Sequence, residues 1–339
     1  MPLIPQIGRN HIRIRTLVIG ISLFLWAGII MHLFPFWWML ATSFKATAEV
    51  YSNPAGFFPK EVSFASYKLL FGTLTGSKAL AAGSIFQYPM TLYIKNSLIL
   101  SFTTIAIQIP ATLLLAYACS RLHYPIARSI IFYLCVATMM IPYQVKMIPV
   151  FLMLSHFPWP TDYIPYIPFT SIQFPSFSLI GSFWGIILPI TFNGYNFLIM
   201  KSSFDTIDKG YIEAARMDGC SEFGIVTHII LPLSRPVIAF VSYQAFIMSW
   251  NNFLGPWIIL QNVQQKWPLA VIIYQLQAFL TAASSSQATS ASAEAMRAAG
   301  AGYNALMALA LIECIPVFTM FVFFREQIMK GVKIQGLKA

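Results

Sequence analysis

The chain has 339 residues, of which 58% are hydrophobic and only 9% are charged, and its formal net charge is +10 at pH 7. A soluble domain carries about 25% charged residues, so this composition excludes an ordinary soluble protein and predicts a polytopic membrane protein. The basic residues are scattered and form no recurring face at helical spacing, which excludes a nucleic-acid-binding role.

A transmembrane helix needs about 20 predominantly apolar residues. The stretches that meet this condition are Thr16–Thr42, Leu92–Ala118, Arg128–Leu154, Leu179–Met200, Val237–Leu260 and Tyr303–Phe324. The first is too long for a removable signal peptide and lacks a small-residue cleavage site. We therefore predict an all-α fold with six transmembrane helices.

Lysine and arginine gather in the N-terminal segment, in the connection Arg121–Arg128 and in the C-terminal tail. Cytoplasmic loops of membrane proteins are enriched in these residues, so both termini are predicted to be cytoplasmic. The loop 43–91 also holds lysines, but long loops cross the membrane largely regardless of charge.

The whole chain, 1–339, is predicted to form a single transmembrane domain. Its parts outside the membrane are an N-terminal cytoplasmic segment 1–15, an outer loop 43–91, a Pro-rich and aromatic outer insertion 155–178, a cytoplasmic loop 201–236, a low-complexity outer loop 281–300 and a cytoplasmic tail 325–339.

The loop between the fourth and fifth predicted spans is a polar island in an apolar chain. Asp205 is a good N-cap and Asp208 falls in the first turn, where a negative charge suits the helix dipole. The helix is expected to stop at Gly219, and Ser221 can cap a second short helix that ends near Pro232. The pattern predicts a helix, a turn and a second helix at the membrane face.

On the first of these helices, Tyr211, Ala214 and Ala215 fall close to one face together with Ile207. The alanines leave room for a partner to approach closely, and Glu213 beside them is available for charged contacts. Taken alone, the segment also fits an amphipathic helix that rests on lipid headgroups.

The joint spacing of the loop resembles the EAA loop, by which permease subunits of binding-protein-dependent ATP-binding-cassette importers dock on their ATPases. The residues that carry this resemblance are Tyr211, Glu213, Ala214, Ala215, Arg216, Asp218, Gly219, Ile229, Leu231 and Pro232. Runs similar to the sugar-type subfamily, that of the maltose and glycerol-phosphate permeases, are Phe34–Lys45, Tyr93–Ser97, Ala116–Pro125, Met139–Pro149 and Ser249–Pro256.

The resemblance implies a subunit of an importer in a prokaryotic inner or plasma membrane. With a second permease subunit, expected to be a different chain, it would form the path for a sugar or related polyol that an extracytoplasmic binding protein delivers. Two cytosolic ATPase subunits would hold ATP and Mg and carry out hydrolysis. We therefore expect no catalytic residue, no metal site and no cofactor on this chain.

Sugars present hydroxyls around apolar CH faces, so amides and aromatic rings of the fourth and fifth spans are candidates for the solute path. These candidates are Asn193, Tyr195, Asn196, Tyr243, Gln244, Trp250, Asn251 and Asn252. A structural role is the alternative for each, because Tyr and Trp gather at membrane interfaces and Asn bonds to neighbouring helices.

Two other classes of function fit the sequence less well. An ion-coupled transporter or channel without an ATPase partner would not need an EAA-like loop. A membrane enzyme would need acidic residues or histidines clustered at one membrane face, and the inner loops lack such a cluster. The run Gly72–Lys78 does not have the spacing of a phosphate-binding loop.

Overall fold

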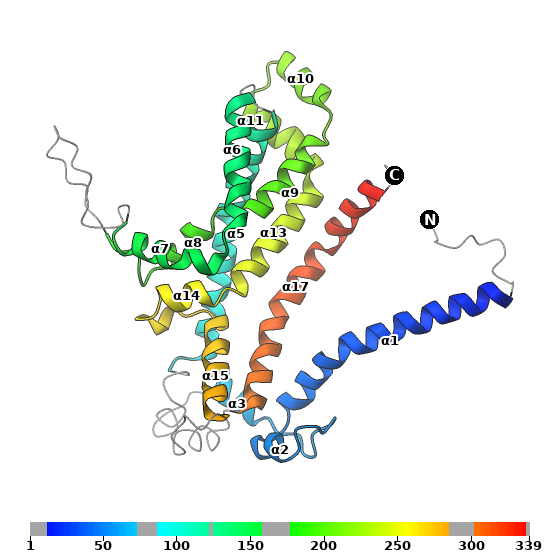
Figure 1. Ribbon diagram of the computed structural model, residues 1–339, viewed down its shortest axis with the longest axis vertical. Helices are drawn as coiled ribbons and strands as arrows, with labels where there is room; N and C mark the ends of the chain where they lie inside the picture. Colours follow the sequence, from blue (N-terminus) through cyan, green and yellow to red (C-terminus); the bar gives the residue numbers. More distant parts are fainter. Residues whose placement is uncertain (1–11, 73–86, 122–124, 158–176, 285–301, 337–339) are drawn as a thin grey trace. The chain divides into compact units, whose positions relative to one another are not determined.

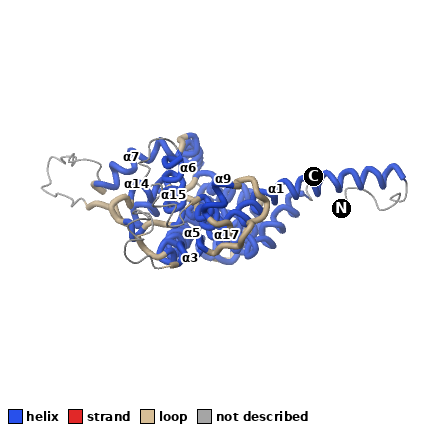
Figure 2. Tube along the Cα trace, turned by 90° about the horizontal axis from the view of Figure 1, so that it is seen from below, coloured by secondary structure: helices blue, strands red, loops and turns tan. Residues whose placement is uncertain are grey.

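A computed structural model describes residues 12–72, 87–121, 125–157, 177–284 and 302–336. These residues form helices and loops, and no strand occurs among them (Figure 2). One isolated β-bridge joins Phe157 to Phe177. The prediction of an all-α protein is confirmed for this part of the chain. A helix satisfies its own backbone polar groups, which apolar surroundings require.

The chain divides into two compact units, Met1–Gly83 with Leu280–Ile312 and Ser84–Phe279 with Glu313–Ala339. The first unit contains α1 (Ile12–Ser43), α2 (Thr47–Ser52) and α3 (Ala65–Phe71). Lys45 is buried in it and donates a hydrogen bond to the Gly56 carbonyl at 2.7 Å. The Asn304 amide donates to the Lys45 carbonyl at 3.3 Å, so distant parts of the sequence are joined in this unit.

The second unit carries the polar loop and most of the helices. They are α5 (Met90–Arg121), α6 (Pro125–Ala137), α7 (Tyr143–Ser155), α8 (Phe183–Ile190), α9 (Gly194–Asp205), α10 (Lys209–Met217), α11 (Glu222–Ile225), α12 (Leu231–Leu233), α13 (Arg235–Trp250) and α14 (Leu254–Ile259). Both units receive residues from α15 (Leu269–Ser284) and α17 (Tyr303–Gly336). Helices α5, α9 and α13 pack side by side, with α10 at one end (Figure 1).

Three described helices are long and apolar enough to cross a membrane: Ile14–Ser43, Met90–Arg121 and Tyr303–Met329. Three bent pairs of helices pass the same test when each pair is taken together. Large apolar side chains of α1, including Phe24 at 79% and Met31 at 76%, are exposed. Such a surface suits lipid and not water.

The third and fourth predicted spans are not single straight helices. The third is broken between α6 and α7 by 106°, and the fourth between α8 and α9 by 44°. Pro142 is the N-cap of α7, and Ile141 before it is extended, as a residue before proline tends to be. Asn193 is the N-cap of α9, and its side chain accepts a hydrogen bond from the Asn196 N–H at 3.1 Å.

The fifth predicted span also ends early. Helix α13 stops at Trp250, and α14 is a separate short helix that starts at Leu254. Helix α15 is absent from the predicted spans, because at 16 residues it is shorter than a membrane crossing. The predicted tail 325–339 continues α17 as far as Gly336. Residues 158–176 and 285–301, most of the two predicted outer insertions, lie outside the described part.

Candidate functional site

The polar loop between α9 and α13 contains α10, a tight turn and a second helical stretch that runs from α11 through Val226–Ile230 to α12. Helix α10 follows Asp208, whose carboxylate accepts a hydrogen bond from the Gly210 N–H at 2.9 Å. The turn after α10 reaches Gly219, whose φ is +79°. Glycine is the residue that adopts this left-handed conformation without a steric penalty. The helix end predicted at Gly219 is therefore observed.

The expectation that Asp205 caps this helix is wrong. Asp205 is the last residue of α9, and its carboxylate pairs with Lys201 Nζ at 2.7 Å and accepts a hydrogen bond from Ser120 Oγ. Asp208 is the cap because its backbone is extended, with φ −61° and ψ 132°. An N-cap requires such a non-helical backbone, whereas Asp205 is still helical.

Helix α10 is anchored by one buried side chain. Ile212 is only 2% exposed and belongs to the apolar cluster that α5, α9 and α13 also build. Ala215 packs against this cluster, whereas Tyr211 and Ala214 are exposed. The face expected to combine Tyr211 with both alanines is therefore divided between the protein core and solvent. Ile207 precedes the helix instead of lying on it.

Large apolar side chains of α10 and α11 are exposed, namely Tyr211 at 62%, Met217 at 88% and Phe223 at 70%. Burying such a side chain on a partner is favourable by about 1.5–3 kcal/mol. The sequence reasoning missed Met217 and Phe223 because it followed the small and charged positions. Their signal is the presence of large apolar residues inside an otherwise polar segment.

An ion pair closes the turn between the two short helices. Arg216 Nε lies 2.8 Å from Glu222 Oε1, and Arg216 Nη2 lies 3.2 Å from Glu222 Oε2. The Tyr117 hydroxyl of α5 donates a hydrogen bond to the same carboxylate. The hydrogen bonds to Glu222 raise the pKa of Arg216 above its ordinary value. The carboxylate thus ties both short helices to the end of α5.

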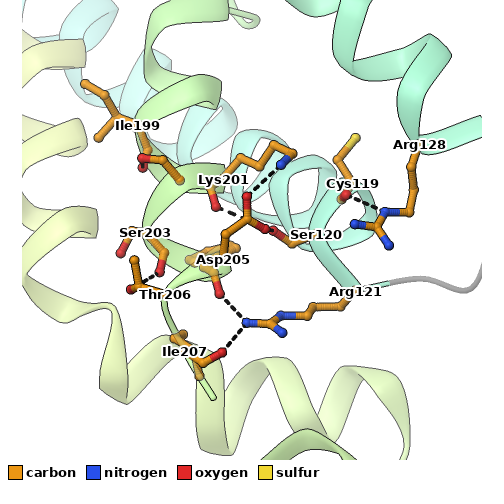
Figure 3. Close-up of polar contacts among 12 residues, drawn as sticks. Cys119, Ser120, Arg121, Arg128, Ile199, Lys201, Ser203, Asp205, Thr206 and Ile207 are labelled. Atoms are coloured by element: carbon orange, nitrogen blue, oxygen red, sulfur yellow. Dashed lines mark hydrogen bonds and ion pairs between the residues drawn. The ribbon is translucent and has the colours of Figure 1, made fainter. Parts of the chain in front are cut away.

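A second polar network joins the end of α5 to α9 (Figure 3). The Arg121 side chain is 8% exposed, and its Nη2 donates hydrogen bonds to the carbonyls of Phe204 and of Ile207, the latter at 2.6 Å. Together with the Ser120–Asp205 bond, these contacts hold the last turn of α9 against α5. The start of the loop is therefore held in place by hydrogen bonds to α5.

The second short helix starts at Ser221, whose hydroxyl accepts a hydrogen bond from the Gly224 N–H at 3.2 Å. Ile229 and Leu231 pack against the apolar cluster, and Pro232 lies in α12. Helix α12 ends at Leu233, and the chain then turns by 85° into α13. The predicted Ser221 cap and the helix end near Pro232 are both observed.

A cavity of about 940 Å³ lies within the second unit, at the breaks between α6 and α7 and between α8 and α9. Four of the sequence candidates line it: Asn193, Tyr195, Asn251 and Asn252. The Asn252 amide donates a hydrogen bond to the Tyr143 hydroxyl at 3.3 Å across this cavity wall. Its size is within the range of small-molecule sites.

The other four candidates do not line this cavity. The Asn196 side chain is fully buried, and Trp250 donates its indole N–H to the Glu313 carbonyl at 3.1 Å. Tyr243 packs its ring against Phe321 with centroids 6.2 Å apart. Gln244 is half-buried and is not a lining residue.

Several lining residues were missed by the sequence reasoning. On α5, Thr104 and Gln108 line the cavity although both are buried. They belong to a row of buried polar residues at helical spacing, which could have signalled them. The row consists of Ser97, Ser101, Thr104, Gln108 and Thr112. Aromatic rings complete the wall, including Phe253 stacked on Tyr274 at 4.6 Å.

Apolar spans, a polar helical loop and a polar-lined cavity between broken helices are together the features of a membrane transport protein. The chain belongs to the family described as the binding-protein-dependent transport system inner membrane component, whose pattern matches residues 108–324. It is thus the permease subunit of an ATP-binding-cassette importer, as the resemblance of the loop predicted. The alternative of a transporter or channel without an ATPase partner has no support from this family.

Relatives match the chain over nearly its whole length. Protein LplC of Bacillus subtilis (strain 168) is 26% identical over 90% of this chain and 88% of LplC. The polygalacturonan/rhamnogalacturonan transport system permease protein YtcP of the same organism is 28% identical over 90% of this chain and 92% of YtcP. The arabinooligosaccharides transport system permease protein AraQ, also from Bacillus subtilis (strain 168), is 26% identical over 94% of this chain and 95% of AraQ.

The fold is also that of a solved structure. A chain of a bacterial ATP-binding-cassette transporter involved in the import of the acidic polysaccharide alginate has a TM-score of 0.70 with 19% sequence identity. The match covers 94% of this chain and 98% of that chain.

Proposed function

We propose that the chain crosses the membrane six times, with both termini in the cytoplasm, and forms the translocation path together with a second, different permease chain. The three long apolar helices, the bent pairs α6–α7 and α8–α9, and the span that contains α13 would supply these six crossings. Lysine and arginine in the N-terminal segment, in the connection after α5 and in the tail support the cytoplasmic side. Loop 201–236 is then cytoplasmic, and loops 43–91, 155–178 and 281–300 are outside.

We further propose that α10 and α11 dock on a cytosolic ATPase. The observation that carries this proposal is the exposure of Met217, at 88%, at the end of α10, which Ile212 and the Arg216–Glu222 pair hold in place. A helix that transmits force must be fixed to its own subunit and must also offer apolar surface to its partner. ATP and Mg would be held by two separate ATPase subunits, and this chain would bind no cofactor.

The transported solute is proposed to be a sugar or an oligosaccharide delivered by an extracytoplasmic binding protein. Two relatives are named for polygalacturonan/rhamnogalacturonan and for arabinooligosaccharides, which supports this class. The 940 Å³ cavity combines amide groups such as Asn252 with aromatic rings such as Tyr274. Amides suit the hydroxyls of a sugar, and rings suit its apolar faces.

Closure of the ATPases around ATP would move α10 and, through α5 and α9, the helices that surround the cavity. The broken helices α6–α7 and α8–α9 meet at this cavity, so a small rotation of one half-helix would open or close it. Transport would then follow alternating access between two states that ATP binds with different affinity.

The test is reconstitution of the permease pair with its co-expressed ATPase and binding protein, followed by ATPase measurements across a panel of sugars. We expect one loaded binding protein to stimulate hydrolysis. Failure of any ATPase to associate with the pair would contradict the docking proposal. Association with no response to any sugar would contradict the solute class alone.

A further inference from the structure

A second cavity of about 640 Å³ lies at the loop end of the bundle, between α5, α6, α9 and α10. Its wall carries the basic side chains Arg121, Arg128, Lys201, Lys209 and Arg216. Two acidic side chains, Asp205 and Glu213, also line it. Positive charge is therefore in excess in this cavity. The cavity shares no lining residue with the 940 Å³ cavity proposed for the solute, so solute binding does not explain the charge.

The hydrogen bonds of these residues leave part of this charge uncompensated. Lys201 pairs with Asp205, and Arg216 pairs with Glu222. Arg121 donates only to neutral carbonyls, and its buried Nε has no hydrogen-bond partner among the described residues. Lys209 has no ion pair among them either. A buried guanidinium without a counter-charge is costly, and an anion in the cavity would remove that cost.

A smaller groove of about 300 Å³ adjoins this cavity and shares Pro125, Arg128 and Lys201 with it. Its remaining wall includes the aromatic rings of Phe132 and Tyr133 of α6. Lys201 Nζ lies 5.1 Å from the centre of the Phe132 ring, at the junction of the two hollows. Beyond the groove, the surface of α6 is apolar and open. Its exposed side chains include Ile126 at 76%, Ile130 at 54% and Leu134 at 62%.

We propose that this cavity binds the phosphate of an anionic phospholipid from the cytoplasmic leaflet, with the acyl chains lying in the groove and along α6. The cytoplasmic side rests on the proposed function. Basic pockets between transmembrane helices are suited to such headgroups. A free phosphate would use the basic cavity but not the groove, so the joined shape favours a lipid.

The bound phosphate would lie between Arg121 of α5, Lys201 of α9 and Lys209 of α10. One anion would thus bridge the three elements that connect the ATPase-docking loop to the bundle. The lipid would stiffen this connection, and a membrane poor in anionic lipid would weaken coupling without altering the solute cavity. The carboxylate of Glu213 on the same wall would repel the anion.

The experiment uses the complete importer complex in detergent, titrated separately with phosphatidylglycerol, phosphatidylcholine and inorganic phosphate and followed by native mass spectrometry. We expect one phosphatidylglycerol to be retained per copy of this chain, in preference to phosphatidylcholine. Lys209→Gln should weaken its binding about 5-fold, and Glu213→Gln should strengthen it. The matched control is Lys95→Gln, which removes an exposed charge at the other end of α5.

Equal retention of the two lipids, or equal effects of the Lys209 and Lys95 variants, would overturn the proposal. Inorganic phosphate that displaces phosphatidylglycerol with similar affinity would assign the cavity to a free anion and overturn the lipid site. The same spectra report whether the ATPase is bound. Loss of lipid preference with the ATPase in place would contradict only this inference, whereas absence of the ATPase from the wild-type complex would contradict the proposed function.

Discussion

Arg216 and Glu222 face each other across the turn at Gly219, with Nε and Oε1 2.8 Å apart. Their side chains are 24% and 46% exposed, so the pair contributes at most about 1 kcal/mol to the free energy of unfolding. Its main consequence is geometric. Glu222 also accepts a hydrogen bond from Tyr117 of α5. The pair therefore holds α10 and α11 in one orientation to each other and to α5.

Glu222→Gln tests whether this angle matters for coupling. The amide keeps the size of the side chain but removes the charge that Arg216 pairs with. We expect the melting temperature to change little and the ATPase stimulation by loaded binding protein to fall about 2- to 10-fold. Glu326→Gln, at an exposed acid of α17, is the control. An unchanged stimulation in Glu222→Gln would show that the pair is dispensable for coupling.

Gly219 tests the backbone of the turn without a steric complication. A Cβ at this position would meet nothing within 4 Å, so the cost of a substitution comes from its φ of +79° alone. Gly219→Ala should destabilise the loop by about 1 kcal/mol, and Gly219→Asn by less, because asparagine tolerates this region. Limited proteolysis of the loop in the assembled complex measures which of the two variants destabilises the loop more. Greater protection of the alanine variant than of the asparagine variant would contradict it.

Met217 tests the docking surface. We expect Met217→Glu to leave membrane insertion intact and to reduce ATPase co-purification about 10- to 100-fold, because a methionine buried on a partner is worth about 1.5–3 kcal/mol. Thr206→Glu places the same charge on another exposed position near the start of the loop and serves as the control. Equal losses in both variants would indicate a general effect of charge and not a docking site.

Asn252 tests the proposed solute path. Its amide lines the large cavity and donates to Tyr143, so Asn252→Ala removes a polar group that a sugar hydroxyl could use. We expect the KM for uptake in proteoliposomes to rise about 2- to 10-fold with ATPase association unchanged. Gln244→Ala is matched in span and residue type but lies outside the cavity lining. A larger effect of Gln244→Ala would move the solute path away from this cavity.

Much of this protein follows from local properties of its sequence. Apolar runs of sufficient length predicted the membrane crossings, because their burial in lipid depends on composition and length. The helix ends within the polar loop could be predicted from local sequence in the same way. Gly219 ends α10 and Ser221 starts the next helix by conformational and hydrogen-bonding preferences that act within a few residues.

Capping shows where such local reasoning stops. Asp205 and Asp208 are chemically alike and three residues apart, yet only Asp208 caps a helix. Asp205 is engaged by Ser120, which is 85 residues away in the sequence. Its role was decided by packing between α5 and α9.

The cavities were decided in the same way by the tertiary structure. Sequence spacing selected polar residues of the fourth and fifth spans, but the breaks at Pro142 and Asn193 determine which of them reach a common space. Tyr117 meets Glu222 across 105 residues of sequence. Periodicity and capping report only neighbours along the chain, whereas these contacts depend on how helices far apart in sequence pack against one another.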